Sequence, residues 1–494
     1  MFFPSTISVC GVRGIPCATW GRLSQIRIVM LKSALLILSG NATASLLLLA
    51  RNLIIARLIP VADYGIASTF AIAMALVEMM SNLGLQQQIV QAKNGEDPRF
   101  QAALQGFQVL RGVFAGAVLF FLAGTLTDFL NVPEATWAYQ LMALVPVLNA
   151  LKHFDIHRMN RSMVFWPLIL TGVVPALLSV LAVWPLAIIY GDYKVMLYAI
   201  LIQVGMTAVV SHLVAERPYR LILDRHVMAQ SLRFGWPLLV NGILLFGIFQ
   251  GDKVVVGREL GMDTLAIFAM GFTLTLTPML VMTQSSQNFF LPPLSGLDRS
   301  TEAGRDRFQY LSIVVMQISI VMGLFLVFGV FLFRDLLVQV LLGPKYLTLI
   351  PILLPLAIMQ AARVARAGAA TIALSSGHTG NAMQANLIRI AVLPLAWYAV
   401  TQGAGVFVVI MIAIIGEAGG YVLSCVLVAR KPGIALGPMV LPVLTSTAFL
   451  GAAMLASRLE NIPVWMRVAM LGALFVATLA SMKETRRYIA RRRS

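Results

Sequence analysis

The sequence predicts an all-α polytopic membrane protein, and three observations lead to this fold class. First, 59% of the 494 residues are hydrophobic and only 12% are charged, whereas soluble domains average about 45–50% apolar and about 25% charged residues. Second, apolar runs of roughly 20 residues recur, which is the length that a helix needs to cross a hydrocarbon core about 30 Å thick. Third, these runs lack the alternation of polar and apolar residues that membrane strands show.

The apolar runs predict about fourteen transmembrane helices. We place them at residues 33–56, 66–85, 105–127, 136–151, 163–183, 195–214, 235–256, 264–284, 308–332, 346–362, 383–401, 404–428, 436–456 and 463–481. Prolines lie within several of these spans, including Pro146 and Pro394. Prolines are tolerated in packed membrane helices that bend.

An internal repeat organises the helices into two halves. The stretch 40–85 is echoed about 201 residues later, where residues 251–270 align without a gap. The aligned residues are Leu53, Ile54, Ile55, Arg57 and Ile59 with Val254, Val255, Val256, Arg258 and Leu260. The repeat indicates two halves of similar design, each opening with a helix that carries polar residues: Arg51 and Asn52 in one half, Asp252 and Lys253 in the other.

These boundaries predict six segments. They are a cytoplasmic N-terminal segment at 1–32, with Met30 as an alternative start, a six-helix bundle at 33–216, a cytoplasmic linker at 217–234, a second six-helix bundle at 235–429, two extra helices at 436–481 and a basic cytoplasmic tail at 482–494. The N-terminal segment lacks the apolar region and cleavage site of a signal peptide.

Basic residues predict the orientation of the chain in the membrane. Lysine and arginine are concentrated at both ends of the chain and in the loops after even-numbered helices, and cytoplasmic loops show this enrichment. The loops after odd-numbered helices hold only Arg57, Lys194, Arg258, Arg334, Lys345 and Arg458. We therefore expect both termini to be cytoplasmic. The net charge of +17 then follows mostly from topology and attraction to membrane lipids, and does not indicate nucleic-acid binding.

Several activities find no support in the sequence. No predicted loop exceeds about 25 residues, so the long outer catalytic loop expected of a membrane glycan ligase is missing. There is no G-x-x-x-x-G-K-[ST] motif for nucleotide hydrolysis. Cys10, Cys17 and Cys425 form neither a disulfide framework nor a zinc motif. We expect no enzyme activity, no cofactor and no metal.

One histidine cluster resembles a metal site only superficially. Residues 151–161 place His153 and His157 four residues apart with Asp155 between them. The cluster lacks the glutamate of H-E-x-x-H and falls in a basic loop. We expect this loop to be solvated or to face lipid headgroups.

Ionisable residues within the apolar spans are the candidate functional residues, because each is costly unless it faces a cavity or a partner. The candidates for a cationic cavity are Arg51, Asn52, Arg111, Lys253, Arg363 and Arg389, with Arg363 and Arg366 placed just beyond the helix at 346–362. Arginine binds phosphate through two parallel hydrogen bonds. The alternative is that Arg51 and Lys253 reach to the interface, and that Arg111 and Arg389 do so or pair with Glu78 or Glu417.

Three intramembrane carboxylates are candidates for ion coupling. Glu78, Asp252 and Glu417 each have the chemistry to bind a coupling proton or sodium ion. Structural ion pairing is the alternative for each of them.

Four stretches of the sequence resemble the polysaccharide biosynthesis export proteins, the oligosaccharide flippases of the superfamily that also contains the multidrug and toxin extruders and the lipid II flippases. These stretches are ARNLIIARLIPVADYG (50–65), SNLGLQQQIVQ (81–91), MNRSMVFWPL (159–168) and LRFGWPLLVNG with GDKVVVGRELG (within 232–261). The resemblance implies two six-helix bundles related by a pseudo-twofold axis, a central cavity and two further C-terminal helices.

The resemblance also implies a function. It implies that the chain moves an undecaprenyl-pyrophosphate-linked oligosaccharide across the bacterial cytoplasmic (inner) membrane by alternating access, for surface polysaccharide such as lipopolysaccharide or exopolysaccharide. Its partners would be the lipid-linked oligosaccharide, membrane lipids and other polysaccharide assembly proteins. A drug or cation antiporter, a peptidoglycan-precursor flippase and a membrane glycan ligase are the alternatives. Intramembrane bases outnumber acids here, which argues against the antiporter.

Overall fold

The protein is all-α in the part of the chain that the structure describes. The computed structural model describes residues 39–81, 83–92, 94–378, 380–459 and 461–493. These residues form helices and connecting turns, with no strand among them, which confirms the predicted fold class. The predicted N-terminal segment at 1–32 and the alternative start at Met30 lie outside the described residues.

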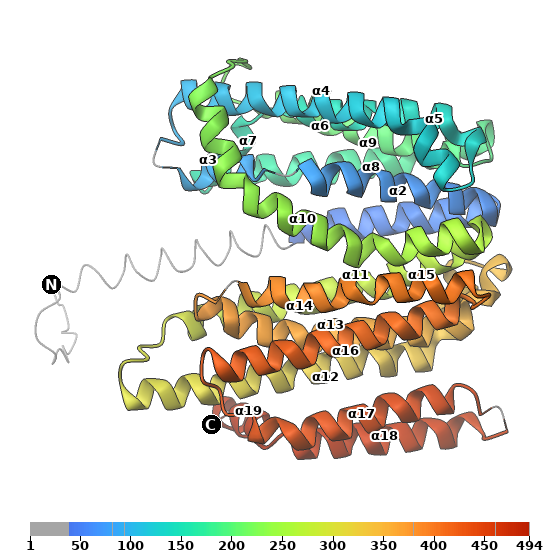
Figure 1. Ribbon diagram of the computed structural model, residues 1–494, viewed down its shortest axis with the longest axis vertical. Coiled ribbons are helices and arrows are strands. Elements are labelled where there is room, and N and C mark those ends of the chain that lie inside the picture. Colours follow the sequence, from blue (N-terminus) through green and yellow to red (C-terminus); the bar gives the residue numbers. More distant parts are fainter. Residues whose placement is uncertain (1–38, 82, 93, 379, 460, 494) are drawn as a thin grey trace, which may run out of the picture.

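Helices from the first half of the chain pack together as an N-lobe, at the top of Figure 1. The N-lobe contains a first helix described from residue 39 to 58, α2 (Val61–Ser81), α3 (Leu85–Gln91), α4 (Pro98–Phe129), the short 3₁₀ helix η1 (Pro133–Ala135), α5 (Thr136–Met142), α6 (Leu144–Ala150), α7 (Asp155–Arg161), α8 (Trp166–Ile189) and α9 (Lys194–Leu213). Within it α8 packs along α9, and α4 packs against α5 and α6.

The second half of the chain forms a C-lobe, and a helical hairpin packs on its outer side (Figure 1). The C-lobe contains α10 (Arg225–Leu260), α11 (Met262–Ser295), α12 (Glu302–Leu341), η2 (Pro344–Leu349), α13 (Ile350–Ser375), α14 (Gly380–Ala391), α15 (Leu393–Thr401) and α16 (Val406–Arg430), and the chain ends with η3 (Gly437–Met439), α17 (Val440–Ala456), α18 (Val464–Ser481) and α19 (Lys483–Arg493). Helices α17 and α18 pair with each other and contact α12.

Twelve helices in the described part of the chain are long and apolar enough to cross a membrane. The other two predicted spans are 33–56, of which the structure describes only residues from 39 onward, and 136–151, which corresponds to the pair α5–α6 and is broken at Ala143. Pro146 explains the break, because proline has no N–H to donate and its ring crowds the carbonyl four residues earlier. Pro394 accompanies a similar break between α14 and α15. The count of fourteen therefore stays a prediction.

Several membrane helices are longer than their apolar runs. Helix α10 begins at Arg225, where the side chain of Asp224 accepts hydrogen bonds from the backbone N–H groups of His226 and Val227, as a helix N-cap does. The predicted linker at 217–234 is therefore helical from Arg225 onward. The remaining connection, residues 214–224, joins α9 to α10 without helix or strand; we call it the interlobe strap.

The two ends of the helical bundle differ in composition. One end, on the left in Figure 1, carries α3, α7, α19 and the interlobe strap; we call it the basic end, because it holds the arginine-rich connections of the sequence. The other end, which we call the opposite end, carries the turns that follow α4, α10 and α12. The lobes meet closely there, since a Cβ atom on Gly65 at the start of α2 would clash with the backbone carbonyl of Met262 in α11.

Two matched sets of hydrogen bonds join the lobes at the opposite end. Arg57 of the first helix donates from Nη1 to the carbonyl of Val340 near the end of α12, at 3.0 Å. Lys345 in turn donates from Nζ to the carbonyls of Arg57 and Ile59, at 3.2 and 3.3 Å.

The second set mirrors the first from the other lobe. Arg258 near the end of α10 donates from Nη1 to the carbonyl of Phe129 at the end of α4, at 2.5 Å, and its guanidinium lies 4.4 Å from the centre of the Phe129 ring. Asn131 donates from Nδ2 to the carbonyl of Arg258, at 3.0 Å. Because Arg57 and Arg258 are aligned in the sequence repeat, the two sets fit a pseudo-twofold relation between the lobes. We call them together the interlobe lock.

Candidate functional site

Two arginines and one glutamate meet at the centre of the C-lobe. Arg363 lies in α13, Arg389 in α14 and Glu417 in α16, and their exposed fractions are only 4%, 5% and 3%. Glu417 Oε1 accepts hydrogen bonds from Arg363 Nε at 2.5 Å and from Arg389 Nη2 at 2.6 Å. Arg363 and Glu417 fall near the middle of α13 and α16, and Arg389 falls near the middle of the span 380–401 that α14 and α15 form together, so this Arg–Glu–Arg cluster lies deep in the membrane-spanning part of the protein.

Further contacts hold the two guanidinium groups in place. Arg363 donates to Gln360 Oε1 at 3.3 Å and to the carbonyl of Ile248 at 3.4 Å. Its guanidinium also lies 5.3 Å from the centre of the Phe272 ring, within the range of a cation–π interaction. Arg389 donates from Nη1 to Asn386 Oδ1 at 2.8 Å. These partners reduce the cost of burying two cations beside one carboxylate.

A small cavity adjoins the Arg–Glu–Arg cluster. It has a volume of about 20 Å³ and is lined by Asp252, Arg363, Arg389 and Glu417 together with apolar side chains, so it is large enough for about one water molecule. Two buried polar atoms beside it, Glu417 Oε2 and Arg389 Nε, have no hydrogen-bond partner in the structure. The cavity therefore suits one small polar molecule or ion.

The C-lobe site carries more positive than negative charge. Lys253 is next to Asp252 in α10, and its Nζ lies 4.7 Å from the centre of the Phe272 ring. Arg366 follows one turn after Arg363 in α13, and its buried Nε atom has no hydrogen-bond partner among the described residues. Four bases thus lie in this region of the C-lobe with two carboxylates, Asp252 and Glu417.

A second charged cavity lies within the N-lobe. It has a volume of about 180 Å³ and is lined by Glu78 of α2, Arg111 of α4 and Lys152, which follows α6. Gln108 and Asn149 add amide groups to its wall. Bases again outnumber acids here, by two to one.

Arg51 lines neither the C-lobe cavity nor the N-lobe cavity. It is 8% exposed and donates from Nη1 to Ser179 Oγ of α8 at 3.1 Å and to Gln203 Oε1 of α9 at 2.5 Å. Asn52 Oδ1 accepts from Arg51 Nε and Nη2 at 3.4 Å. Arg51 and Asn52 are therefore tied into the packing of the N-lobe, and a role of either in substrate binding stays a prediction.

The position predicted for Arg363 and Arg366 is wrong. The sequence placed both residues beyond a helix ending at 362, whereas α13 continues to Ser375. The residues around them are mostly alanine and glycine, which continue the helix and let neighbouring helices approach. Glu417, far away in the sequence, supplies the charge that stabilises Arg363 within the lobe.

The predicted ionisable residues are thus distributed over separate places. Arg363, Arg389, Glu417 and Asp252 come together in the C-lobe, and Arg111 and Glu78 come together in the N-lobe. The single cationic cavity expected from the sequence corresponds here to two smaller cavities. The roles of all these residues in binding or ion coupling stay predictions.

Among the described residues, no group of three His, Cys, Asp or Glu side chains could hold a metal ion.

The histidine loop is buried, which corrects the expectation of a solvated or headgroup-facing loop. His153, Asp155 and His157 are exposed by 3%, 0% and 5%. Asp155 accepts hydrogen bonds from Arg158 Nε at 2.5 Å and from the backbone N–H groups of Glu216 and Arg217 at 2.9 and 3.1 Å. This carboxylate therefore ties the start of α7 to the interlobe strap.

Titration of this loop follows from its burial. Burial alone would raise the pKa of Asp155, but the hydrogen bonds from Arg158 and from the backbone of Glu216 and Arg217 outweigh it and lower that pKa. Burial, reinforced by the charge of Lys152, lowers the pKa of His157 to about 3. Asp155 is therefore charged and His157 neutral at neutral pH.

The fold and the buried charges define a polytopic helical membrane protein with charged cavities inside both lobes. Its fold is similar to that of the lipid II flippase MurJ in an inward closed conformation, with a TM-score of 0.69 and 13% identity over 92% of this chain and 100% of that one. It is also similar to an inward-facing multidrug resistance MATE family transporter of the MOP superfamily, with a TM-score of 0.61 and 12% identity over 83% and 95% of the two chains.

The sequence comparisons identify the family. The model of the polysaccharide biosynthesis protein family matches residues 54–351, and the chain belongs to this family. It is 20% identical to an uncharacterized membrane protein in the cps region of Klebsiella pneumoniae, over 78% of this chain and 76% of that protein. It is 21% identical to the lipopolysaccharide biosynthesis protein WzxC of Escherichia coli K12, over 62% and 61% of the two chains. The two structural neighbours are named as a lipid flippase and a multidrug resistance transporter.

Proposed function

We propose that this protein carries an undecaprenyl-pyrophosphate-linked oligosaccharide across the bacterial cytoplasmic membrane for surface polysaccharide synthesis. The observation that carries the proposal is the excess of cations inside both lobes, at the buried Arg363 and Arg389 in the C-lobe and at the half-buried Arg111 in the N-lobe. Membrane-buried charges are costly and mark substrate pathways. A pyrophosphate cannot cross hydrocarbon unaided, and arginine is the side chain best suited to bind it.

The proposed mechanism is alternating access between the two lobes. The interlobe lock supports it, because the lock consists of hydrogen bonds between side chains of one lobe and backbone carbonyls of the other. Such bonds can break without unfolding a helix. In this mechanism the lock closes the opposite end while substrate enters from the basic end, and the two small cavities join into one cationic cavity when the lobes rearrange.

Orientation, partners and energy source belong to the same proposal. The basic end faces the cytoplasm, as the positive-inside rule requires, so both termini are cytoplasmic and the opposite end faces outward. The lipid tail stays among membrane lipids during transport, and other polysaccharide assembly proteins supply or receive the substrate. Glu417 and Asp252 share one cavity with two arginines, so they, with Glu78, are the candidates to bind a coupling proton or sodium ion.

A peptidoglycan-precursor flippase is the second candidate function, and the fold similarity to the lipid II flippase MurJ favours it. The family match favours surface polysaccharide. A cation antiporter fits less well, because its cavity should carry a net negative charge. Two bases and one acid line the N-lobe cavity, and two bases and two acids line the C-lobe cavity.

The test is to delete the gene in its host and measure lipid-linked sugars together with surface polysaccharide. We expect finished lipid-linked oligosaccharide to accumulate on the cytoplasmic face while surface polymer disappears, and the wild-type gene to restore the polymer. Accumulation of peptidoglycan precursor would favour the second candidate. Sensitivity to cationic drugs with normal glycan would contradict both and favour the antiporter.

In the same strain, the variants Arg111→Ala and Arg389→Ala test the cationic cavity. Each should lower surface glycan while the protein remains in the membrane at normal abundance. The matched control is Arg225→Ala, because Arg225 is an exposed arginine at the basic end. Normal output from both cavity variants would contradict the cationic-cavity argument.

A further inference from the structure

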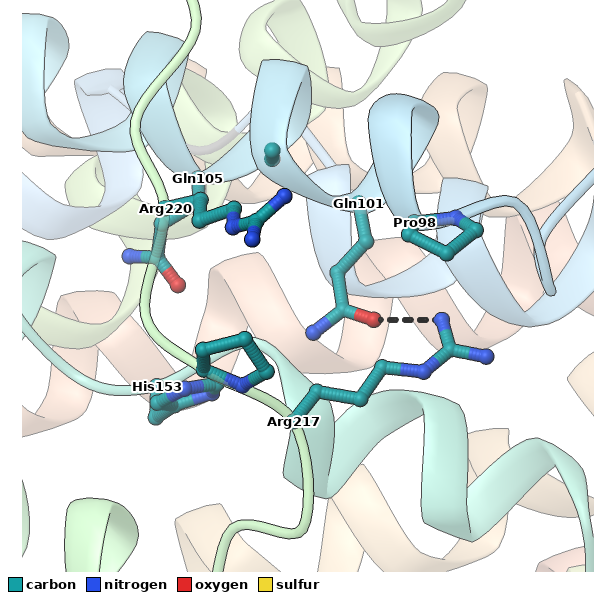
Figure 2. A pocket seen from close by; sticks show the side chains of 8 residues that line it. Pro98, Gln101, Gln105, His153, Arg217 and Arg220 are labelled. Atoms are coloured by element: carbon teal, nitrogen blue, oxygen red, sulfur yellow. Dashed lines mark hydrogen bonds between the residues drawn. The ribbon is translucent and has the colours of Figure 1, made fainter.

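The basic end contains a pocket that the transport mechanism does not use. It has a volume of about 260 Å³ and lies between the first two turns of α4, the segment after α6 and the interlobe strap. Arg217 and Arg220 extend into it from the strap, with Gln101 of α4 between them, as Figure 2 shows. His153 forms part of the wall on the side of the strap.

The pocket is built by contacts that fix its walls. The backbone N–H of Ile222 in the strap donates to the carbonyl of Ala102 in α4 at 3.1 Å. A side chain at Gly106 would clash with the Ile222 carbonyl, so the close approach of strap and helix depends on this glycine. Gln105 accepts a hydrogen bond from the backbone N–H of Phe154 at 2.8 Å. The contacts of Ile222 hold the strap against α4, and the hydrogen bond of Gln105 holds the segment after α6 against the same helix.

The polar groups left facing the pocket are donors. Arg217 donates from Nη1 to Gln101 Oε1 at 3.0 Å, and its Nη2 lies 3.6 Å from Glu96, a carboxylate that also approaches Arg158 and Arg161. Arg220 is exposed, and no carboxylate among the described residues forms an ion pair with it. The positive charge of Arg220 is therefore not neutralised within the described chain.

His153 supplies a buried donor. It is 3% exposed, and its Nδ1 accepts a hydrogen bond from the backbone N–H of Asp155 at 3.1 Å, so a neutral ring carries its proton on Nε2. Burial, with the charge of the neighbouring His212, lowers the pKa of His153 and favours this neutral form. Among the described residues, Nε2 is buried and forms no hydrogen bond of good geometry; the backbone of Arg217 is its nearest partner and forms at most a weak hydrogen bond with the ring, which acts to raise the pKa of His153. A buried N–H that is so poorly satisfied is costly.

We propose that this pocket binds a phosphate group, with Arg220, Arg217 and the Nε2–H of His153 as its donors. Phosphate offers several acceptor oxygens and a negative charge, which match two guanidinium groups and one neutral N–H. The phosphate comes either from solution or from the headgroup of an anionic phospholipid. Binding draws the strap, which leads into α10, closer to α4. The site is separate from the two cavities within the lobes and does not depend on which substrate is carried.

The experiment measures thermal unfolding of the full-length protein purified in detergent, with inorganic phosphate replacing chloride at constant ionic strength. A ligand that binds only the folded state raises the unfolding temperature in a concentration-dependent way. We expect this rise for the wild type and an apparent phosphate affinity about tenfold weaker for Arg220→Ala, which loses a charge-assisted hydrogen bond. His153→Phe should weaken phosphate binding as well. Arg225→Ala, which removes an exposed arginine outside the pocket, should respond like the wild type.

A second arm distinguishes the source of the phosphate. The same proteins are placed in lipid nanodiscs of phosphatidylcholine alone or with phosphatidylglycerol. If phosphatidylglycerol stabilises the wild type but not Arg220→Ala, while inorganic phosphate has no effect, the ligand is a lipid headgroup. If neither probe separates Arg220→Ala from the wild type, or if Arg225→Ala loses the response equally, the pocket is not a phosphate site and the proposal is wrong.

Discussion

Arg57 and Arg258 occupy equivalent places in the two lobes, and each donates a hydrogen bond to a carbonyl near the end of a helix in the other lobe. Arg57 reaches Val340 in α12, and Arg258 reaches Phe129 in α4. The backbone carbonyl of each arginine also accepts a hydrogen bond from the other lobe. Lys345 donates to the carbonyl of Arg57, and Asn131 donates to the carbonyl of Arg258. The sequence repeat thus corresponds to a reciprocal contact that closes one end of the protein.

Removing both arginines should open the interlobe lock. Each such hydrogen bond contributes about 0.5–1.5 kcal/mol, so the variant Arg57→Ala/Arg258→Ala should increase the population open at the opposite end by roughly tenfold. A cysteine at Ile59, which is fully buried, reports this opening through its rate of maleimide labelling after the native cysteines are replaced by serine. The control is Arg334→Ala, whose ion-pair partner Asp335 lies in the same lobe. Unchanged labelling in the double variant would show that the lock does not hold the lobes together.

The repeat and the membrane helices could be read from the sequence because both depend on local apolar patterns. Hydrophobic runs of membrane length show where helices are, and aligned residues such as Arg57 and Arg258 show that two halves are related. Breaks within a span were harder to foresee. Pro146 and Pro394 were visible in the sequence, but whether a proline bends a helix or breaks it depends on the neighbours that accept its freed backbone groups.

The candidate site could be predicted only in part, because its members come from distant segments. Arg363 and Arg389 were candidates on account of their charge alone, and the sequence gives no means to see that both meet Glu417. The sequence pattern predicts an end of the helix before Arg363, because two arginines at 363 and 366 interrupt the apolar run and their partner Glu417 is distant in the sequence. The same reason explains why the sequence predicts a solvated or headgroup-facing loop at His153 and Asp155: the residues that bury Asp155 lie in the interlobe strap.

Arg51 distinguishes a structural arginine from a substrate-binding one. Its hydrogen bonds to Ser179 and Gln203 join the first helix to α8 and α9, so Arg51→Ala should destabilise the protein by about 1–3 kcal/mol. We expect a lower unfolding temperature in detergent and less protein in the membrane, with surface glycan falling in proportion. Arg51→Lys, which keeps a donor and the charge, should be milder. Normal protein abundance with loss of glycan would instead place Arg51 in the substrate pathway.

His157 should make the protein sensitive to acid. Its pKa is lowered by burial from 6.5 to about 3, so between these values the unfolded state binds a proton that the folded state does not. Stability is therefore complete above pH 6.5 and decreases as the pH falls, by about 1.4 kcal/mol per pH unit from this group. The difference in unfolding temperature between pH 7 and pH 5 should shrink in His157→Gln. His226→Gln, at an exposed position in α10, should leave it unchanged, and equal acid sensitivity of His157→Gln and the wild type would contradict the assignment.

Glu417 should matter more for stability than any other single residue of the C-lobe site, because it is the carboxylate that both Arg363 and Arg389 contact. Glu417→Ala leaves two buried guanidinium groups without this partner, and breaking a buried ion pair from one side costs about 3–5 kcal/mol. Thermal unfolding in detergent measures the loss, and Ser424→Ala, in the same helix, is the control with little expected effect.

Glu417→Gln retains an oxygen that accepts hydrogen bonds but cannot bind a proton. If Glu417 only holds the arginines, the Gln variant should keep part of both stability and glycan output; if it also couples transport to protons, the variant should fold but export no glycan. A Glu417→Ala protein as stable as the wild type would contradict the structural role on which both outcomes depend.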